Sequence, residues 1–285
     1  MFKSKKREMD LIIDGGASTY KYVIYKKGKF YKEDESVGAN FMHGLDNVSF
    51  SSIKERKSIE NIYLFGAGIR DTDDNSKLIE HIKKCFTKSK TVYVNNDLEI
   101  VALAFSDQKE CMVGILGTGS NAAKAKSGKM VDNIVAGGYI IGDQGSGYKI
   151  GKKVLQYYIE NQFTKSEEKA FVKAYGYNKL DVVKAIYASP NHKRFVASFS
   201  RFLGELRPKT QNKILSREFY KFFRNVSKQI KGSEKLTYNF VGSIASVYGK
   251  ELRKEAKKQG INVNKIIKSP FERIDTIYSY IQANF

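Results

Sequence analysis

Four short glycine-bearing segments could bind phosphate, and each follows or lies close to a predicted β-strand. Glycine has no Cβ, so backbone N–H groups around it can converge on an anion. Ser and Thr hydroxyl groups add donors to phosphate oxygens. One such segment is usually only a tight turn, but several at strand ends of one α/β chain favour a phosphate site. The segments are residues 14–19, 117–121, 142–147 and 242–245.

These segments differ from the two commonest nucleotide-binding motifs. No G-x-x-x-x-G-K-[ST] sequence is formed by them: Gly142 and Gly147 have the required gap, but Tyr148 occupies the lysine position. No G-x-G-x-x-G follows a predicted strand, which disfavours a Rossmann dinucleotide site. The absence of a Gly-x-Ser-x-Gly elbow weakens a serine-hydrolase interpretation.

Two aspartates at the ends of predicted strands offer metal and acid–base chemistry. Asp14 opens the first glycine segment, where its carboxylate could hold Mg²⁺ through water, because Mg²⁺ dehydrates reluctantly. Asp97 could accept a proton from a hydroxyl group that attacks a phosphate. Each aspartate taken alone is more often a turn or helix-cap residue. The three histidines show no ligand spacing, so no zinc site is expected.

Strands and helices that alternate along the chain must position these residues. Helical periodicity follows the third strand, which gives a β–β–β–α–β–α order typical of α/β layering. A polar break at residues 106–110 predicts a domain boundary, and the chain beyond residue 147 is mostly helical. Apolar residues at helical spacing predict a helix over 216–230 with one face toward the core. The residues of this apolar stripe are Phe219, Phe222, Phe223, Val226 and Ile230.

Length and composition bound the fold and the compartment. The chain has 285 residues, 41% of them hydrophobic, which suffices for the core of one large or two modest domains. No apolar run approaches the roughly 18 residues of a membrane span, and the apolar run near the N-terminus is short for a signal peptide. Cys85 and Cys111 are the only cysteines, so a disulfide framework is excluded and a reducing, cytoplasmic location is expected.

The strongly basic composition raises the question of a nucleic-acid partner. The 50 Lys and Arg residues against 30 Asp and Glu give a formal net charge of +20. The basic clusters are spread along the chain and mixed with acidic residues, and no zinc-finger spacing, basic region with heptads or RNP-like strand is present. We therefore expect a solvated, lysine-rich surface and no nucleic-acid partner.

The residues of the glycine segments and their spacing resemble the motifs of the BadF/BadG/BcrA/BcrD group of the actin-like ATPase superfamily and, within it, of the N-acetylglucosamine kinases. The resemblance extends from about residue 10 to residue 270. Its most specific parts are residues 115–121, which resemble the second phosphate loop, and residues 137–147, which resemble a long glycine signature. Further likenesses are to the first phosphate loop (14–19), a Gly-x-Asn sugar-binding segment (38–40), the catalytic aspartate (96–97) and the adenosine-side turn (240–245).

The resemblance implies an α/β protein of two actin-like, ribonuclease H-like lobes with ATP and sugar in the cleft between them. Residues 10–110 would form the N-terminal lobe and residues 111–270 the C-terminal lobe, while residues 271–285 would return to the first lobe as a helix. Residues 1–9 would be a flexible basic tail, in which Met9 is an alternative start to Met1. Relatives are often dimers, so a homodimer is one option.

The resemblance also implies which residues perform the reaction. Asp97 would be the catalytic base for the 6-hydroxyl of an amino sugar, with N-acetylglucosamine favoured over glucosamine and N-acetylmuramic acid. Asp14 would hold Mg²⁺ through water. ATP would be bound by Asp14, Gly16, Ser18, Thr19, Gly117, Thr118, Gly119, Gly242 and Ser243. The sugar would be bound by Asn40, Asp97, Ser120, Asn121, Gly137, Gly138 and Asp143.

Some positions depart from the family's usual pattern and keep alternatives open. Thr19 stands where the first loop often carries Lys or Arg, and Gln144 replaces a usual Glu. These departures leave room for a sugar-binding sensor that has lost turnover. Another alternative is an ATPase that activates a radical dehydratase through an iron–sulfur cluster, which would need Cys85 and Cys111 at a dimer interface.

Overall fold

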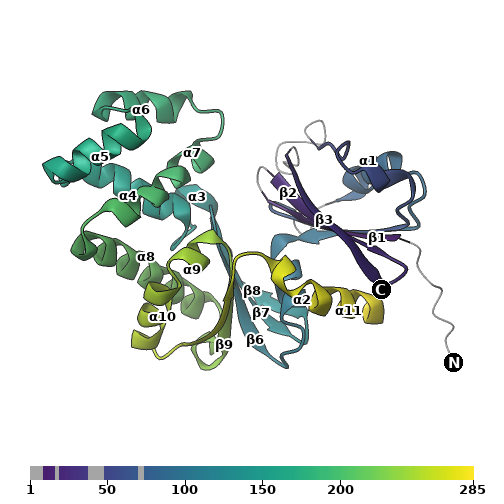
Figure 1. Cartoon of the computed structure of the whole chain (residues 1–285). Helices are drawn as coiled ribbons and strands as arrows, with labels where there is room; N and C mark the ends of the chain where they lie inside the picture. The colour runs from purple at the N-terminus through teal and green to yellow at the C-terminus, as the bar shows by residue number, and fades with distance from the viewer. Residues whose placement is uncertain (1–8, 17–18, 38–47, 70–73) are drawn as a thin grey trace. The chain divides into compact units, whose positions relative to one another are not determined.

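Two compact units make up the chain, Met1–Ile100 and Val101–Phe285. The structure, a computed structural model, describes residues 9–16, 19–37, 48–69 and 74–285 (Figure 1). Each unit is built on a five-stranded mixed sheet. The division between the units falls within helix α2 (Asp97–Ala104), just before the polar break that predicted a boundary.

The first unit's sheet has the strand order β3-β2-β1-β4-β5. β1, β2 and β3 pair antiparallel, whereas β4 and β5 run parallel to β1. The register aligns Gly15 of β1 with Gly66 of β4, and Gly66 with Asn96 of β5, so residues 14–16 and 96–97 lie at one edge. The elements are β1 (Met9–Gly15), β2 (Thr19–Lys26), β3 (Lys29–Val37), η3 (Lys54–Lys57), β4 (Asn61–Gly66), α1 (Ser76–Cys85) and β5 (Thr91–Asn96).

The second unit's sheet repeats this topology without a visible sequence repeat. Read from β8, its order is β8-β7-β6-β9-β10, with two antiparallel pairs followed by two parallel ones. The carboxyl ends of β6 and β9 therefore deliver two glycine segments, 117–119 and 242–245, to one edge. The strands are β6 (Cys111–Leu116), β7 (Ser120–Lys126), β8 (Lys129–Asn133), β9 (Thr237–Val241) and β10 (Asn262–Ile267).

The helices of the second unit include one that the sequence patterns did not predict. Helix α5 (Lys165–Tyr175) begins with a capping box between Thr164 and Glu167, and it lies with α6 away from the sheet (Figure 1). The other helical elements are α3 (Gly138–Ile141), α4 (Gly147–Ile159), α6 (Lys179–Ala188), α7 (His192–Ser198), η4 (Phe199–Glu205), α8 (Pro208–Gln229), η5 (Ser233–Lys235), α9 (Ser243–Val247), α10 (Gly249–Lys258), η6 (Pro270–Arg273) and α11 (Ile274–Asn284).

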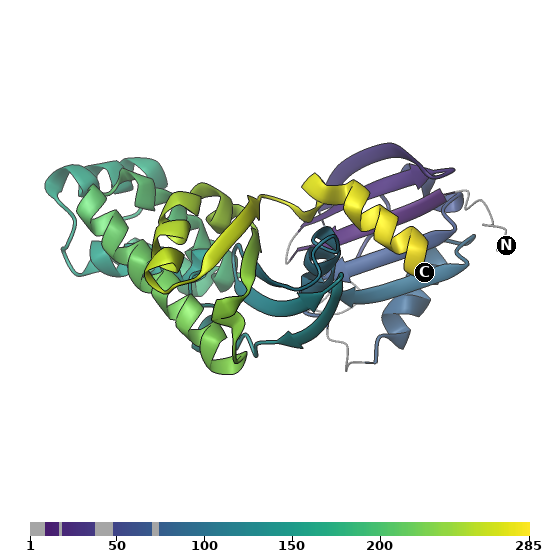
Figure 2. The same cartoon turned by 90° about the horizontal axis from the view of Figure 1, so that it is seen from below.

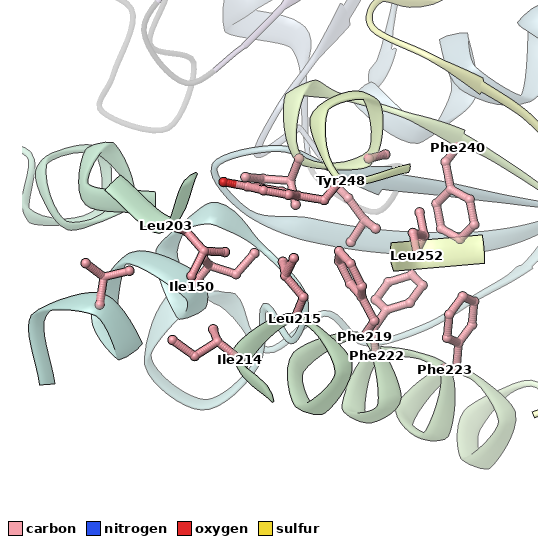
Figure 3. Packing of buried hydrophobic residues seen from close by; sticks show 14 of the residues in the cluster. Ile150, Leu203, Ile214, Leu215, Phe219, Phe222, Phe223, Phe240, Tyr248 and Leu252 are labelled. Atoms are coloured by element: carbon pink, nitrogen blue, oxygen red, sulfur yellow. The ribbon is translucent and has the colours of Figure 1, made fainter. Parts of the chain in front are cut away.

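The apolar stripe on α8 is buried, as its spacing predicts. Phe219, Phe222 and Phe223 face β9 and α10 in Figure 3, and the Phe222 ring lies 5.8 Å from that of Phe240. The helices α8 and α10 lie side by side, as Figure 2 also shows. α8 begins at Pro208 rather than at residue 216, because proline is well accommodated in the first turn of a helix.

The C-terminal helix α11 belongs to the second compact unit. Arg273, just before it, donates to Asp107 at 2.6 Å and lies over the Phe105 ring. Tyr280 of α11 lies against Gly128 of the β7–β8 turn. The return of residues 271–285 to the first lobe and the lobe boundaries at 110/111 stay predictions. In the described part of the chain, no helix combines the length and apolar character that crossing a bilayer requires.

A glycine in α4 allows α7 to approach closely. A Cβ on Gly151 would come closer than 3.0 Å to the carbonyl oxygen of Val196, a distance at which backbone must shift. The approach places α7 and η4 directly on α4.

Gly151→Ala tests this close packing. A helical Gly→Ala change ordinarily stabilises by about 0.5–1 kcal/mol, but overpacking costs about 1–3 kcal/mol, so we expect a net loss. Urea denaturation should show it, whereas Gly204→Ala, with open space at its Cβ position, should stay near wild type. A Gly151→Ala protein at least as stable as wild type would contradict the packing.

Candidate functional site

The turn between β6 and β7 presents two backbone donors in one direction. The carbonyl oxygens of Gly117 and Thr118 accept hydrogen bonds from the N–H groups of Gly147 (2.8 Å) and Tyr148 (3.1 Å) at the start of α4. The peptide bonds are trans, so the N–H in each of these peptide groups points away from its carbonyl. Those N–H groups belong to Thr118 and Gly119, and no described residue accepts a hydrogen bond from either. The turn can therefore hold an anion on the side away from α4.

Three glycine segments of the second unit meet at this turn. A Cβ on Gly242 would come closer than 3.0 Å to the carbonyl of Leu116, and the φ of Gly242 is +123°. A Cβ on Gly147 would lie 3.2 Å from the carbonyl oxygen of Gly117. These segments are far apart in the sequence, and the structure brings them together. Ser243 is exposed at the start of α9, directly after Gly242.

Asp143 is buried beside the same turn. Its backbone has a positive φ of 57°, which Asp tolerates better than most residues, and its Oδ1 accepts the N–H of Ser120 at 3.3 Å. Its Oδ2 lies 3.1 Å from the Nζ of Lys193 in α7. Asp143 thus links the turn to a cation from a distant part of the chain.

The remaining predicted sugar-binding residues lie near Asp143 in sequence or on β7. Gly137 and Gly138 have positive φ values of 71° and 64° at the start of α3, where a Cβ would be strained. The N–H of Asp143 returns to the carbonyl of Ala136 at 3.2 Å, which folds this segment back on itself. Asn121 follows Ser120 on β7 and is half-buried. The predicted residues Ser18 and Asn40 lie outside the described residues.

The first unit brings two carboxylates together at the edge of its sheet. Asp14 is the residue before the last of β1, and Asp97 begins α2, directly after β5. Burial, together with the negative charge of Asp97, raises the pKa of Asp14 to about 7 from the ordinary value of 3.8. Beside them Gly16 is exposed, and its N–H donates to the carbonyl of Thr19 at 2.9 Å, which closes the first turn.

A network of side chains fixes the segment that carries Asp97. The Asn96 Oδ1 accepts the backbone N–H of Glu99 at 3.1 Å and thereby caps the start of α2. The Tyr93 hydroxyl donates to the Glu99 carboxylate at 2.6 Å and accepts from Asn95 at 3.0 Å. Asp97 is therefore held in the first turn of a helix on a braced strand end.

Two cations near these groups were not predicted from the sequence. Lys21 lies opposite Asp14 in the β1–β2 register, and its positive charge partly offsets the rise in the pKa of Asp14. The antiparallel register across the first turn could have identified Lys21, and it places a cation near the turn where Thr19 replaces a family Lys or Arg. Lys193 follows no motif in the sequence.

The paired carboxylates suit a magnesium ion. Both offer hard oxygen donors. Burial and, after it, the charge of Asp97 raise the pKa of Asp14, and a divalent cation beside them would offset that repulsion. Among the described residues, no group of three or more His, Cys, Asp or Glu side chains could hold a metal. Mg²⁺ usually binds through one or two carboxylates, water and substrate phosphates.

Comparisons with known proteins identify the family of the chain. The model of the BadF/BadG/BcrA/BcrD ATPase family matches residues 13–275. An N-acetylmuramic acid/N-acetylglucosamine kinase of Clostridium acetobutylicum is 32% identical over 142 residues. That match covers 47% of this chain and 45% of the relative, so it spans less than half the length of the curated relative.

Solved structures resemble the whole chain. A Porphyromonas gingivalis protein provisionally assigned as an N-acetylglucosamine kinase matches with a TM-score of 0.85 at 26% identity, over 96% of this chain and 99% of that one. A ROK-family glucokinase from Streptomyces griseus, solved with glucose and AMPPNP, matches in fold with a TM-score of 0.55 at 11% identity, over 95% and 98% of the two chains. These likenesses and the two five-stranded sheets confirm the expected actin-like α/β fold.

The raised pKa of Asp14 predicts how the metal-free protein responds to pH. The folded pKa of about 7 lies above the ordinary 3.8, so the folded state holds this proton more tightly. Its contribution to stability is full below about pH 4 and is lost as the pH rises to 7. We expect a loss on the order of 1–2 kcal/mol, allowing for the partial exposure of the carboxyl group.

Chemical denaturation of wild type and Asp14→Asn between pH 4 and pH 8, in the presence of a chelator, would measure this effect. Relative to wild type, Asp14→Asn should become more stable as the pH rises. Parallel stability curves for the two proteins would contradict the assignment.

Proposed function

Because the chain belongs to the BadF/BadG/BcrA/BcrD ATPase family, we propose that it transfers the terminal phosphoryl group of ATP to the 6-hydroxyl of an amino sugar. The observation that carries the proposal is the position of Asp97, fixed at the start of α2 beside Asp14. The name of the Clostridium relative supports an N-acetylated amino sugar, and we propose N-acetylglucosamine as the first acceptor to test.

In the proposed reaction Asp97 accepts the proton of the sugar hydroxyl as this hydroxyl attacks the terminal phosphorus. A carboxylate suits this role because phosphoryl transfer passes through a loose transition state, in which the hydroxyl need not lose its proton early. The brace of Asn96 and Glu99 limits the movement of the carboxylate and so favours a productive position. The bond to the bridging oxygen of ADP breaks as the bond to the sugar oxygen forms.

The backbone turns are proposed to hold ATP. The N–H groups of Thr118 and Gly119, which no described residue accepts, suit the phosphate oxygens of ATP. In the proposed reaction this turn holds ATP and Asp97 acts on the amino sugar. Gly242 and Ser243 are assigned to the nucleoside side, with Gly16, Ser18 and Thr19 on further phosphate oxygens. Asp14 would hold Mg²⁺ through water, which supplies charge neutralisation on the phosphates when bound.

The sugar is assigned to residues that surround Asp143, together with Asn40. The carboxylate of Asp143 and the hydroxyl of Ser120 offer an acceptor and a donor, which is the chemistry that recognises sugar hydroxyl groups. Asn121 adds an amide, and Gly137 and Gly138 allow close approach of a ring to the backbone. We propose N-acetylglucosamine ahead of glucosamine and N-acetylmuramic acid.

The cysteines do not favour a role as an iron–sulfur activator. Cys111 is buried in β6, and burial raises the pKa of its thiol to about 11, whereas a cluster ligand must be an accessible thiolate. Burial also raises the pKa of Cys85. Both thiols are free, which suits the proposed cytoplasmic location.

Asp97→Asn tests the proposed base. Loss of general-base catalysis should lower kcat by about 10²- to 10⁴-fold, while sugar binding measured by calorimetry should persist. Wild type should form ADP from Mg-ATP only when an acceptor sugar is present, in a coupled assay across hexosamines.

Asp132→Asn, at an exposed position on β8, is the matched control and should keep wild-type turnover. Full turnover by Asp97→Asn would refute the base assignment. Sugar binding by wild type without any sugar phosphate would instead identify a sensor.

A further inference from the structure

Lys193 lies on a helix that is anchored to the core of the second unit. The side chain of Asn191 caps the start of α7 by accepting the N–H of Arg194 at 2.9 Å. Two packing contacts then hold the helix: Val196 lies against Gly151 of α4, and Phe199, directly after α7, is buried. The position of Lys193 is therefore set by the fold, unlike that of a lysine on a free surface.

The ammonium of Lys193 lies over the turn that offers the free N–H groups. A Cβ on Gly119 would lie 2.7 Å from the Nζ of Lys193, so the absence of a side chain at residue 119 makes room for the ammonium. The same Nζ is 3.1 Å from the Oδ2 of Asp143. The Lys193 side chain is 32% exposed and that of Asp143 only 4%, so the cation faces solvent and the carboxylate lies behind it.

Charge explains why a cation is needed here. Asp143 holds the N–H of Ser120, the residue directly after the turn, so its negative charge lies close to any anion bound at residues 117–119. A buried carboxylate beside a phosphate would repel it. Among the residues that the structure describes, Lys193 is the one cation paired with Asp143. Its ammonium has three donors, and the pair with Asp143 leaves donors for a ligand.

We propose that Lys193 is a phosphate-binding residue, whose ammonium contacts the phosphoryl group held by the N–H groups of Thr118 and Gly119. The inference rests on the proposed function, because ATP is the source of that phosphoryl group. Lys193 would thus be a cation for ATP in the second unit, contributed by a helix that carries none of the glycine motifs.

Two other roles for Lys193 make different predictions. If the lysine only neutralises Asp143, its loss should be corrected when the carboxylate is also removed. If Lys193 binds a carboxylate-bearing sugar such as N-acetylmuramic acid, its loss should weaken the binding of that sugar and leave the binding of the nucleotide unchanged. The N–H groups of Thr118 and Gly119, to which no described residue offers an acceptor, favour a phosphoryl ligand over both.

Calorimetry with Mg²⁺ and a non-hydrolysable ATP analogue tests the proposal on the full chain. Lys193→Met should weaken binding of the analogue by about tenfold or more, because a charge-assisted hydrogen bond is lost. Lys193→Arg should retain most of the affinity. Arg194→Met removes the same charge from the adjacent exposed position of α7 and should bind as wild type does. Thermal unfolding of each variant confirms that it is folded.

The double variant Asp143→Asn/Lys193→Met decides between direct contact and neutralisation. If Lys193 contacts the phosphoryl group directly, the double variant should still bind the ATP analogue weakly. Recovery of affinity for the analogue would overturn the proposal. Equal affinity of Lys193→Met and wild type, or a loss confined to N-acetylmuramic acid, would overturn it as well. A wild-type protein that binds no nucleotide would refute the proposed function itself, an outcome distinct from equal binding by the two proteins.

Discussion

Two hydrogen bonds from the start of α4 to the carbonyls of Gly117 and Thr118 determine the chemistry of the second unit. Because each peptide group is planar, these bonds turn the next two N–H groups in the opposite direction. The close approach of Gly242 to Leu116 then brings the end of β9 to the same place. A larger residue at position 242 would separate the two strand ends, so packing alone requires a glycine there.

The first unit has the same strand order, but the edge of its sheet carries two carboxylates. Its parallel strands β1 and β5 end at one edge and deliver Asp14 and Asp97 there, where two carboxylates repel each other. This arrangement is unfavourable without a ligand, and Lys21 offsets only part of the cost. A metal ion with phosphate would offset more. In the proposed function, some stability of the free protein is lost here in exchange for binding, as is common at functional sites.

Local sequence patterns predicted what depends on local chemistry. The phenylalanine stripe of α8 and the glycine turns follow from spacing and residue type alone. The start of α8, the helix α5 and the ion pair of Lys193 with Asp143 were not predicted. Those features depend on packing between segments far apart in the sequence. The lysine is 50 residues from its partner and lies in a helix without a motif, so only the tertiary fold reveals it.

A crystal structure of the protein with Mg²⁺, a non-hydrolysable ATP analogue and N-acetylglucosamine would test the central claim most directly. The account predicts that the Asp97 carboxylate lies within about 2.6–3.2 Å of the sugar 6-hydroxyl. It also predicts that the N–H groups of Thr118 and Gly119 point at phosphate oxygens. A sugar bound away from Asp97, or phosphates bound away from residues 117–119, would contradict it.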